Sequence, residues 1–486
     1  MFKGVKMNTS TEKKFFGHPH QLGTLFQVEL WERFSFYSMQ AILVIYLSYQ
    51  LSQGGLAMPK ALAVGIVGAY SGSIYLSTII GGWLADRVIG PKNTLFFAVA
   101  TMLVGHILLV MISGVGSLAG LPFIALGSGG VKSACSTLVG SLYEDESTRN
   151  LRDAGFSIFY TGINIGSFCG SLVAGYLQSN MGFRMAFAGA VVGMAIGLTL
   201  FIKGKSKLPD LPLPNPLPKE QRGKAIGMAL AIVAVVGGLI ATKILRLDNF
   251  SSILLGAISC ISIGYFFMMF NDKQATEADK RHIIAYVPLF IAMCLFWAIY
   301  SQVYSSVTLY FDKTVPRTFG SFTVPVAWLV TYQSLVVIVL ASVMAALWTR
   351  MGTRQPKSQM KFTLAMLLLG LGYLGFVPFL SSGTPMPFFV LMLLLLVITI
   401  SELLLSPISL SFATKVAPKA FKTQMVAFNF LTLSLGFTLG GVLGDQLYTD
   451  DTATQYFIIL AGLGIGSFAI LLLLLPKLNQ LLHDVD

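Results

Sequence analysis

Charge is scarce in this sequence. Only 11% of the 486 residues are Asp, Glu, Lys or Arg, whereas 55% are hydrophobic and the mean hydropathy is +0.75. Soluble domains carry about 25% charged residues, so this composition excludes an ordinary soluble protein. Apolar runs of roughly 20 residues, the length needed to cross a bilayer, recur along nearly the whole chain. We therefore expect a polytopic membrane protein.

Cysteine and histidine are also sparse. Cys135, Cys169, Cys260 and Cys294 lie in apolar runs without CxxC spacing, which predicts buried free thiols. There are five histidines and no HExxH motif, and His106 is predicted to be a hydrogen-bonded core residue. No nucleophile with a base and no cofactor loop is evident, so we expect no enzyme activity, no metal and no cofactor.

The net charge of +12 is distributed unevenly. With the N-terminus placed inside and fourteen spans counted, most of the 33 basic residues fall on the cytoplasmic side. Those outside are Lys60, Arg184, Lys243, Arg246, Lys313 and Arg317, and those within the membrane are Arg33 and Lys132. This asymmetry follows the positive-inside rule. It predicts a multi-pass protein of the cytoplasmic membrane, in contact with lipid and not nucleic acid, with both termini in the cytoplasm.

The expected organisation is two similar halves. A basic cytoplasmic tail over 1–21 precedes six spans within 22–203, and the Pro- and Lys-rich stretch 204–224 is predicted to be a semi-extended cytoplasmic linker. Two spans follow within 225–271, six more within 283–475, and a cytoplasmic tail over 476–486. This pattern predicts an all-α integral membrane protein of fourteen transmembrane helices. It is typical of the major facilitator fold, two six-helix bundles, with two inserted helices.

The turn between the second and third spans carries a motif. It reads Gly82-Trp-Leu-Ala-Asp86-Arg87-Val-Ile-Gly90 and resembles the cytoplasmic loop motif of the major facilitator superfamily. In that superfamily, charge and close packing latch the inner ends of helices together. Asp86 and Arg87 are therefore expected to form a gating element. The alternative is a polar turn that only caps two helices.

Five ionisable residues lie deep within predicted spans: Glu29, Glu32, Arg33, Lys132 and Glu402. Such residues cost at least about 2.5–3.5 kcal/mol each to insert, so they usually mark function. At the rise of an α-helix, Arg33, Lys132 and Glu402 lie roughly 15–18 Å from the inner ends of their spans, in one layer. Cations from the first half would then face an anion from the second, which suits a small zwitterion. The alternative is that these charges only hold helices together.

Four motifs resemble one family, the proton-dependent oligopeptide transporters (POT/PTR). Residues 29–37 read ELWERFSFY, similar to its E-x-x-E-R-F-x-Y-Y signature, and residues 159–167 read FYTGINIGS, similar to F-Y-x-x-I-N-x-G-S. Lys132 within GGVK and Glu402 within SELLLSP match charged positions on the fourth span of the first six and the fourth span of the last six. The likeness runs from about Phe15 to the C-terminus.

The resemblance implies a monomeric symporter that moves di- and tripeptides into the cell by alternating access, with protons as the coupling ion. It assigns proton coupling to Glu29, Glu32, Arg33 and Lys132, with Lys132 pairing with Glu29 and sensing the peptide carboxylate. Glu402 would hold the peptide amino terminus. The expected substrate-binding residues are Arg33, Tyr37, Gln40, Tyr75, Lys132, Asn164, Tyr300, Ser301, Glu402 and Asn429.

The sequence also departs from the family pattern. Gln40 stands where a second arginine is usual, Phe36 where a tyrosine is usual, and Ser301 where an acid commonly precedes the glutamine. Two interpretations stay open: proton coupling survives with altered specificity or stoichiometry, or the chain moves another small zwitterion with weak or absent coupling. Charges of mixed sign, split between the halves, do not favour an ion channel. A receptor built on a transporter scaffold is a further candidate, which peptide exchange would distinguish.

Overall fold

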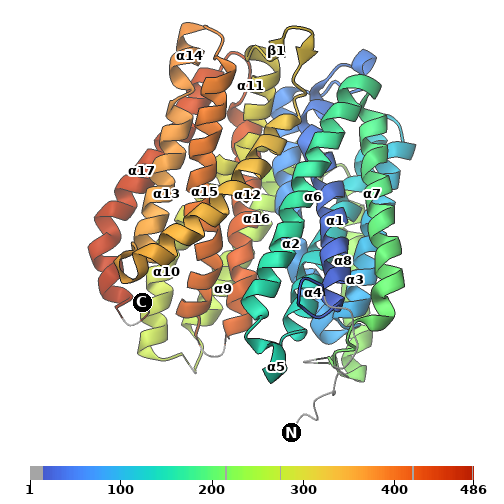
Figure 1. The fold of residues 1–486 in the computed structure, drawn as a ribbon, viewed down its shortest axis with the longest axis vertical. Coiled ribbons are helices and arrows are strands. Elements are labelled where there is room, and N and C mark those ends of the chain that lie inside the picture. Colours follow the sequence, from blue (N-terminus) through green and yellow to red (C-terminus); the bar gives the residue numbers. More distant parts are fainter. Residues whose placement is uncertain (1–14, 214–215, 274, 419–420, 484, 486) are drawn as a thin grey trace.

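The computed structural model describes residues 15–486 except 214–215, 274, 419–420, 484 and 486, so the basic start of the predicted N-terminal tail lies outside the described residues. Most of the described chain is helical (Figure 1). The strands β1 (Thr318–Phe319) and β2 (Phe322–Thr323) form a two-residue antiparallel hairpin. The core is therefore formed by side chains that are buried between helices.

The helices follow one another in three groups. The first group contains α1 (Gln21–Ser48), α2 (Lys60–Arg87), α3 (Pro91–Met111), α4 (Gly120–Ser141), the single turn α5 (Glu146–Arg149), α6 (Arg152–Met181) and α7 (Phe183–Gly204). The second is the pair α8 (Lys219–Ala241) and α9 (Phe250–Phe270). The third contains α10 (Glu277–Tyr300), α11 (Ser306–Thr314), α12 (Trp328–Met351), α13 (Ser358–Leu374), α14 (Val377–Ser382), α15 (Phe388–Val416), α16 (Lys422–Leu447) and α17 (Ala453–Leu481).

Thirteen spans among the described residues are long and apolar enough to cross a membrane. The helix α1 is not among them, although it has 28 residues, because Glu29, Glu32 and Arg33 lower its hydropathy. Those three side chains are at most 3% exposed, so they lie inside the bundle and not against lipid. With α1 included, the fourteen helices match the predicted six, two and six.

Two helix bounds differ from the predicted ones. The helix α8 begins at Lys219, inside the predicted linker, because the residues after Pro218 (KEQRGK) are mostly good helix formers. The helix α17 continues to Leu481, inside the predicted C-terminal tail, and its last turns bury Leu478. The first of the six spans expected within 283–475 is also interrupted, by a 3-10 turn at Ser301–Tyr304 between α10 and α11.

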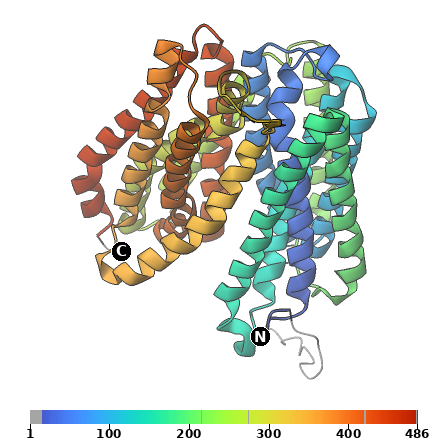
Figure 2. The same cartoon turned by 45° about the horizontal axis from the view of Figure 1, so that its top comes forward.

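The start of α1 and the end of α17 lie at one end of the molecule, here called the terminal end, and β1 and α14 lie at the other, the far end (Figure 1). The two halves pack closely in the part nearer the far end. There Ser171 on α6 is hydrogen-bonded to Thr331 on α12 at 2.8 Å, and the Trp328 indole donates to the Leu172 carbonyl at 3.0 Å. Towards the terminal end, the gold helix α12 diverges from the first half (Figure 2).

Ion pairs also join the halves at the far end. Asp450, between α16 and α17, accepts from Lys60 on α2 at 2.8 Å and from Lys313 on α11 at 2.7 Å. We call these three residues the far-end clamp. The structure is therefore closed at its far end.

The predicted classification of the cysteines is only partly right. Cys135 and Cys294 are buried, Cys169 is half-buried and Cys260 is exposed, all of them free. Cys260 lies on α9, whose outward face carries exposed apolar side chains such as Ile261 and Phe267. An apolar run predicts that a residue lies within the bilayer. It does not distinguish a side chain that faces lipid from one that is buried in the protein.

Candidate functional site

The centre of the candidate site is a charged cluster on α1. The Nε atom of Arg33 lies 3.1 Å from Oε1 of Glu29, and it also forms an ion pair with Glu32. Glu29 and Arg33 are four residues apart, so one helix face presents both side chains. All three residues are nearly fully buried, which makes the mutual neutralisation of their charges essential.

Small residues on α6 make room for this cluster. A Cβ atom added to Gly166 would lie 2.9 Å from the Arg33 Cβ and 3.0 Å from the Phe34 nitrogen. Gly166 belongs to the second signature motif, so the glycine of that motif allows α1 and α6 to approach closely. Phe36, where the family pattern has tyrosine, keeps its ring 5.3 Å from the Arg33 guanidinium.

The helix α4 contributes two polar side chains to the cluster. Ser128 donates a hydrogen bond to Oε1 of Glu32 at 3.0 Å. Lys132, one turn further on, interacts electrostatically with Glu32 and Glu29, and its Nζ lies 5.5 Å from the centre of the Tyr75 ring. Among the described residues Lys132 makes no ion pair within 4.0 Å, so Glu29 pairs with Arg33 here and not with Lys132 as the resemblance implied.

Opposite this cluster, α15 presents Glu402. The Tyr300 hydroxyl donates to its Oε2 at 2.5 Å, and the Gln333 amide lies 3.5 Å from the same hydroxyl. Within the described part of the chain, no cation forms an ion pair with Glu402. A half-buried carboxylate without a counter-ion is available to a cationic ligand group.

Two tyrosines lie between the opposed charges. Tyr37 and Tyr75 each interact electrostatically with both Arg33 and Glu402. Tyr75 also stacks on Phe430 of α16 with ring centres 6.5 Å apart. The cations of the first half and Glu402 of the second half therefore face a shared polar region lined by these rings.

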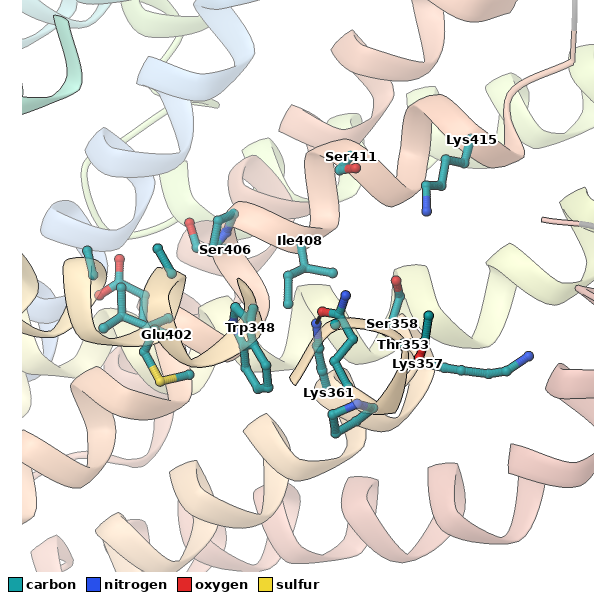
Figure 3. Close-up of a pocket in the computed structure, with 18 of the residues that line it drawn as sticks. Trp348, Thr353, Lys357, Ser358, Lys361, Glu402, Ser406, Ile408, Ser411 and Lys415 are labelled. Carbon is teal, nitrogen blue, oxygen red and sulfur yellow. Dashed lines mark hydrogen bonds between the residues drawn. The ribbon is translucent and has the colours of Figure 1, made fainter. Parts of the chain in front are cut away.

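A cavity of about 780 Å³ leads from Glu402 towards the terminal end (Figure 3). Its walls come from α12, α13, the segment between them, and α15, together with Tyr160 of α6. A smaller void of about 30 Å³, enough for about one water, is enclosed by Tyr37, Gln40 and Tyr75 together with Phe36, Ser71, Ile74, Tyr304 and Phe437.

Two buried amides in this region have unused acceptors. Gln40 donates to Ser71 at 3.3 Å, but its Oε1 has no hydrogen-bond partner among the described residues. Asn429 on α16 is 2% exposed, and its Oδ1 likewise has no partner in the described chain. Nη2 of Arg33, a donor, also has no hydrogen-bond partner among the described residues. Buried polar groups are normally satisfied, so these atoms are candidates for ligand or water contacts.

The remaining predicted contacts are less direct. Ser301 is buried and donates to the Ala298 carbonyl of its own helix at 2.8 Å. Its neighbour Gln302 donates to the Gly440 carbonyl of α16 at 3.0 Å, which ties the 3-10 turn to that helix. The Asn164 amide donates to the Tyr160 carbonyl at 2.9 Å, so its side chain is partly engaged within α6.

The predicted gating turn lies at the terminal end and holds the linker. The Leu217 amide donates to the Arg87 carbonyl at 2.9 Å, and Lys92 forms an ion pair with Asp210 at 2.9 Å. Asp86 and Arg87 are both half-buried. The turn therefore contacts the linker as well as α2 and α3.

His106 differs from its prediction. It is fully buried on α3, but neither ring nitrogen has a hydrogen-bond partner among the described residues. Its neighbour Gly105 lies where α3 and α4 pack closely, since a Cβ added to Gly105 would lie 2.7 Å from the Gly120 carbonyl oxygen. The described residues also contain no group of three or more His, Cys, Asp or Glu side chains placed to hold a metal.

Sequence reasoning missed several residues of the site. Ser128, Gln333 and Tyr160 are uncharged and stand in apolar helices, where neither composition nor spacing distinguishes them from packing residues. Ser128 had one usable signal, because it lies one turn before Lys132 on the same helix face.

Known proteins resemble this chain over nearly its whole length. The model of the POT family matches residues 92–459. An uncharacterised transporter of Bacillus subtilis, YclF, is 37% identical over 98% of this chain and 97% of its own, and a di-/tripeptide transporter of Lactococcus lactis subsp. cremoris is 36% identical over 98% and 99%. A crystal structure of a peptide transporter POT in complex with sulfate is 36% identical, covers 96% of this chain and 97% of its own, and has a TM-score of 0.92. The predicted membrane fold is thereby confirmed.

Proposed function

Since the chain belongs to the POT family, we propose that it carries di- and tripeptides across the cytoplasmic membrane together with protons. The observation that carries this proposal is a pair of opposed charges on either side of Tyr37 and Tyr75, Lys132 and Glu402, neither of which forms an ion pair among the described residues. Lys132 and the free Nη2 of Arg33 face a peptide carboxylate, and Glu402 receives the peptide ammonium. A short peptide is a zwitterion, and a few ångströms of polar backbone separate its two charged ends. It could therefore contact both sides of this site.

The open and closed ends support transport by alternating access. In this proposal the bundles 22–203 and 283–475 rock against each other, and the helix pair 225–271 and linker 204–224 accompany them. The termini and the cavity mouth face the cytoplasm, as the distribution of basic residues favours. The conformation is then inward-open, with the far-end clamp closing the outer side and Asp86 and Arg87 acting on the inner one.

Proton coupling is assigned to Glu29, Glu32, Arg33 and Lys132. When Glu29 or Glu32 takes up a proton, Arg33 loses one of its two anionic partners and becomes a stronger ligand for a carboxylate. Peptide and proton binding would then favour each other, which is the thermodynamic requirement of symport. The chain is expected to work as a monomer without a cofactor.

Facilitated passage with weak coupling is the second candidate. The observation in its favour is Ser301, which stands where an acid is common and uses its hydroxyl within its own helix. The site therefore has fewer carboxylates than the family pattern, and fewer protons would accompany each peptide.

Proteoliposomes that contain the purified protein test both candidates. Labelled dialanine should exchange in counterflow, and an inward pH gradient should drive it above the external concentration. Glu402→Gln should reduce exchange strongly, whereas Glu277→Gln, an exposed carboxylate that pairs with Lys280 away from the cavity, should not. Counterflow exchange without accumulation driven by the pH gradient would favour facilitated passage over proton-coupled transport. No dialanine exchange in either condition would refute peptide transport.

A further inference from the structure

A second charged feature lies at the terminal end of the large cavity, away from Glu402. Lys361 of α13 and Lys415 of α15 both line the wall there (Figure 3). Among the described residues that line the same cavity, Glu402 at its other end is the one acid. The mouth is therefore strongly basic.

Lys361 is the unusual member of this pair. Its side chain is 6% exposed, and its ammonium donates to the neutral Gln355 amide at 2.8 Å and lies 4.1 Å from the centre of the Trp348 ring. No acid forms an ion pair with Lys361 or Lys415 among the described residues, and the two ammonium groups repel each other. Burial of a cation without a counter-ion costs free energy. A bound anion would therefore stabilise Lys361.

The end of a helix adds to this positive potential. The helix α13 begins at Ser358 beside the cavity, its first turn contains no acidic residue, and no side chain caps it. Its free backbone N–H groups and its dipole favour an anion at that position. Lys361 lies in the same first turn, so the ammonium and the helix N-terminus act together.

Distance separates this feature from the peptide site. Glu402 and Lys415 are thirteen residues apart on α15, which corresponds to roughly 20 Å along the helix. A tripeptide spans at most about 11 Å when fully extended. A peptide held by its amino group at Glu402 therefore cannot reach the lysine pair with its carboxylate.

We propose that Lys361, Lys415 and the N-terminus of α13 form a binding site for a phosphate group. The group is either the headgroup phosphate of an anionic lipid or free inorganic phosphate. Trp348 supports a position near the headgroups, because tryptophan is enriched at that level of membrane proteins. Basic pockets between helices near a membrane surface suit such headgroups.

Two measurements on the purified full-length protein test the site and identify the source. The first is the thermal shift produced by inorganic phosphate in lipid-free neutral detergent, against chloride at equal ionic strength. The second is the retention of phosphatidylglycerol, against phosphatidylcholine, in native mass spectrometry. The variants are Lys361→Gln and Lys415→Gln, with Lys477→Gln as control, since Lys477 is exposed and does not line the cavity.

Removal of either cluster lysine should weaken phosphate or phosphatidylglycerol binding about tenfold, and Lys477→Gln should leave it unchanged. A phosphate-dependent shift lost in both variants would identify free phosphate, and loss of phosphatidylglycerol alone would identify the lipid. Without either anion, Lys361→Gln should be at least as stable as wild type, because an uncompensated charge is gone. Equal binding of both anions by wild type and both variants would overturn the proposal.

Discussion

The Tyr300 hydroxyl and the Glu402 carboxylate are joined by a 2.5 Å hydrogen bond that links α10 to α15 within one bundle. Gln333 of α12 approaches the same hydroxyl. Three helices of the second half thus determine where this carboxylate lies. Because Glu402 has no cationic partner in the described chain, its orientation depends on Tyr300.

Tyr300→Phe should therefore weaken peptide binding without abolishing it. Loss of one hydrogen bond to a charged group costs about 1.5–3 kcal/mol, so the Kd for dialanine should rise about ten- to a hundredfold. Glu402→Gln should weaken binding further, because it removes the charge itself. Isothermal titration with dialanine measures both effects.

A matched control is Tyr310→Phe. Tyr310 is also a buried tyrosine of the second half, but its hydroxyl has no hydrogen-bond partner among the described residues and it packs against Phe376 and Phe457. Its removal should leave the Kd unchanged. Equal losses in the two variants would mean that Tyr300 acts through packing and not through Glu402.

Arg33→Lys tests the geometry of the α1 cluster. The guanidinium of Arg33 contacts Glu29 and Glu32 together, whereas a lysine ammonium is a single point and cannot reproduce both contacts. We expect a lower melting temperature in detergent and strongly reduced proton-driven uptake. The control is Arg184→Lys, an exposed arginine whose Nε donates to the Val110 carbonyl at the far end. Full uptake in Arg33→Lys would show that charge alone is sufficient.

The sequence predicts the helices better than their contacts. Hydropathy locates the spans because a bilayer requires about 20 apolar residues for each helix. Spacing within one helix also predicts the Glu29–Arg33 pair, because it depends only on helix geometry. The partners that come from other helices could not be predicted in this way. Ser128 and Glu32 are 96 residues apart, and nothing local connects them.

The far-end clamp shows the same limit and makes a prediction for pH. Lys60 and Asp450 are 390 residues apart, and Asp450 stands in an ordinary polar loop. Partial burial raises the pKa of Asp450, but hydrogen bonds from Lys313 and Lys60 outweigh this and hold the pKa below its usual 3.8. The ion pairs therefore contribute stability above about pH 4 and lose it as the pH falls through the lowered pKa.

Asp450→Asn should thus lower the melting temperature slightly at pH 6, and by progressively less as the pH falls through the lowered pKa of Asp450. The effect should correspond to about 1 kcal/mol or less, because Asp450 is 44% exposed and exposed pairs contribute little. Asp451→Asn is the control, because Asp451 is adjacent to Asp450 but makes no ion pair within the described chain. A difference between wild type and Asp450→Asn that does not shrink as the pH falls through this pKa would contradict this account.

Closure of the far end also requires glycine at the crossing of α2 and α16. A Cβ atom added to Gly68 would lie 2.6 Å from the Gly441 nitrogen and 2.7 Å from the Phe437 carbonyl oxygen, closer than side chains approach backbone. Gly68→Ala should therefore push the two halves apart at this end and disfavour the conformation described here. We expect slower peptide counterflow and greater labelling of a cysteine placed at Val64, which is 1% exposed and faces Gly444 of α16 at this crossing. Gly462→Ala on α17 is the matched control, because an added Cβ there meets no atom within 4 Å. Counterflow and labelling that are the same in both variants would show that the crossing tolerates a methyl group and does not control closure.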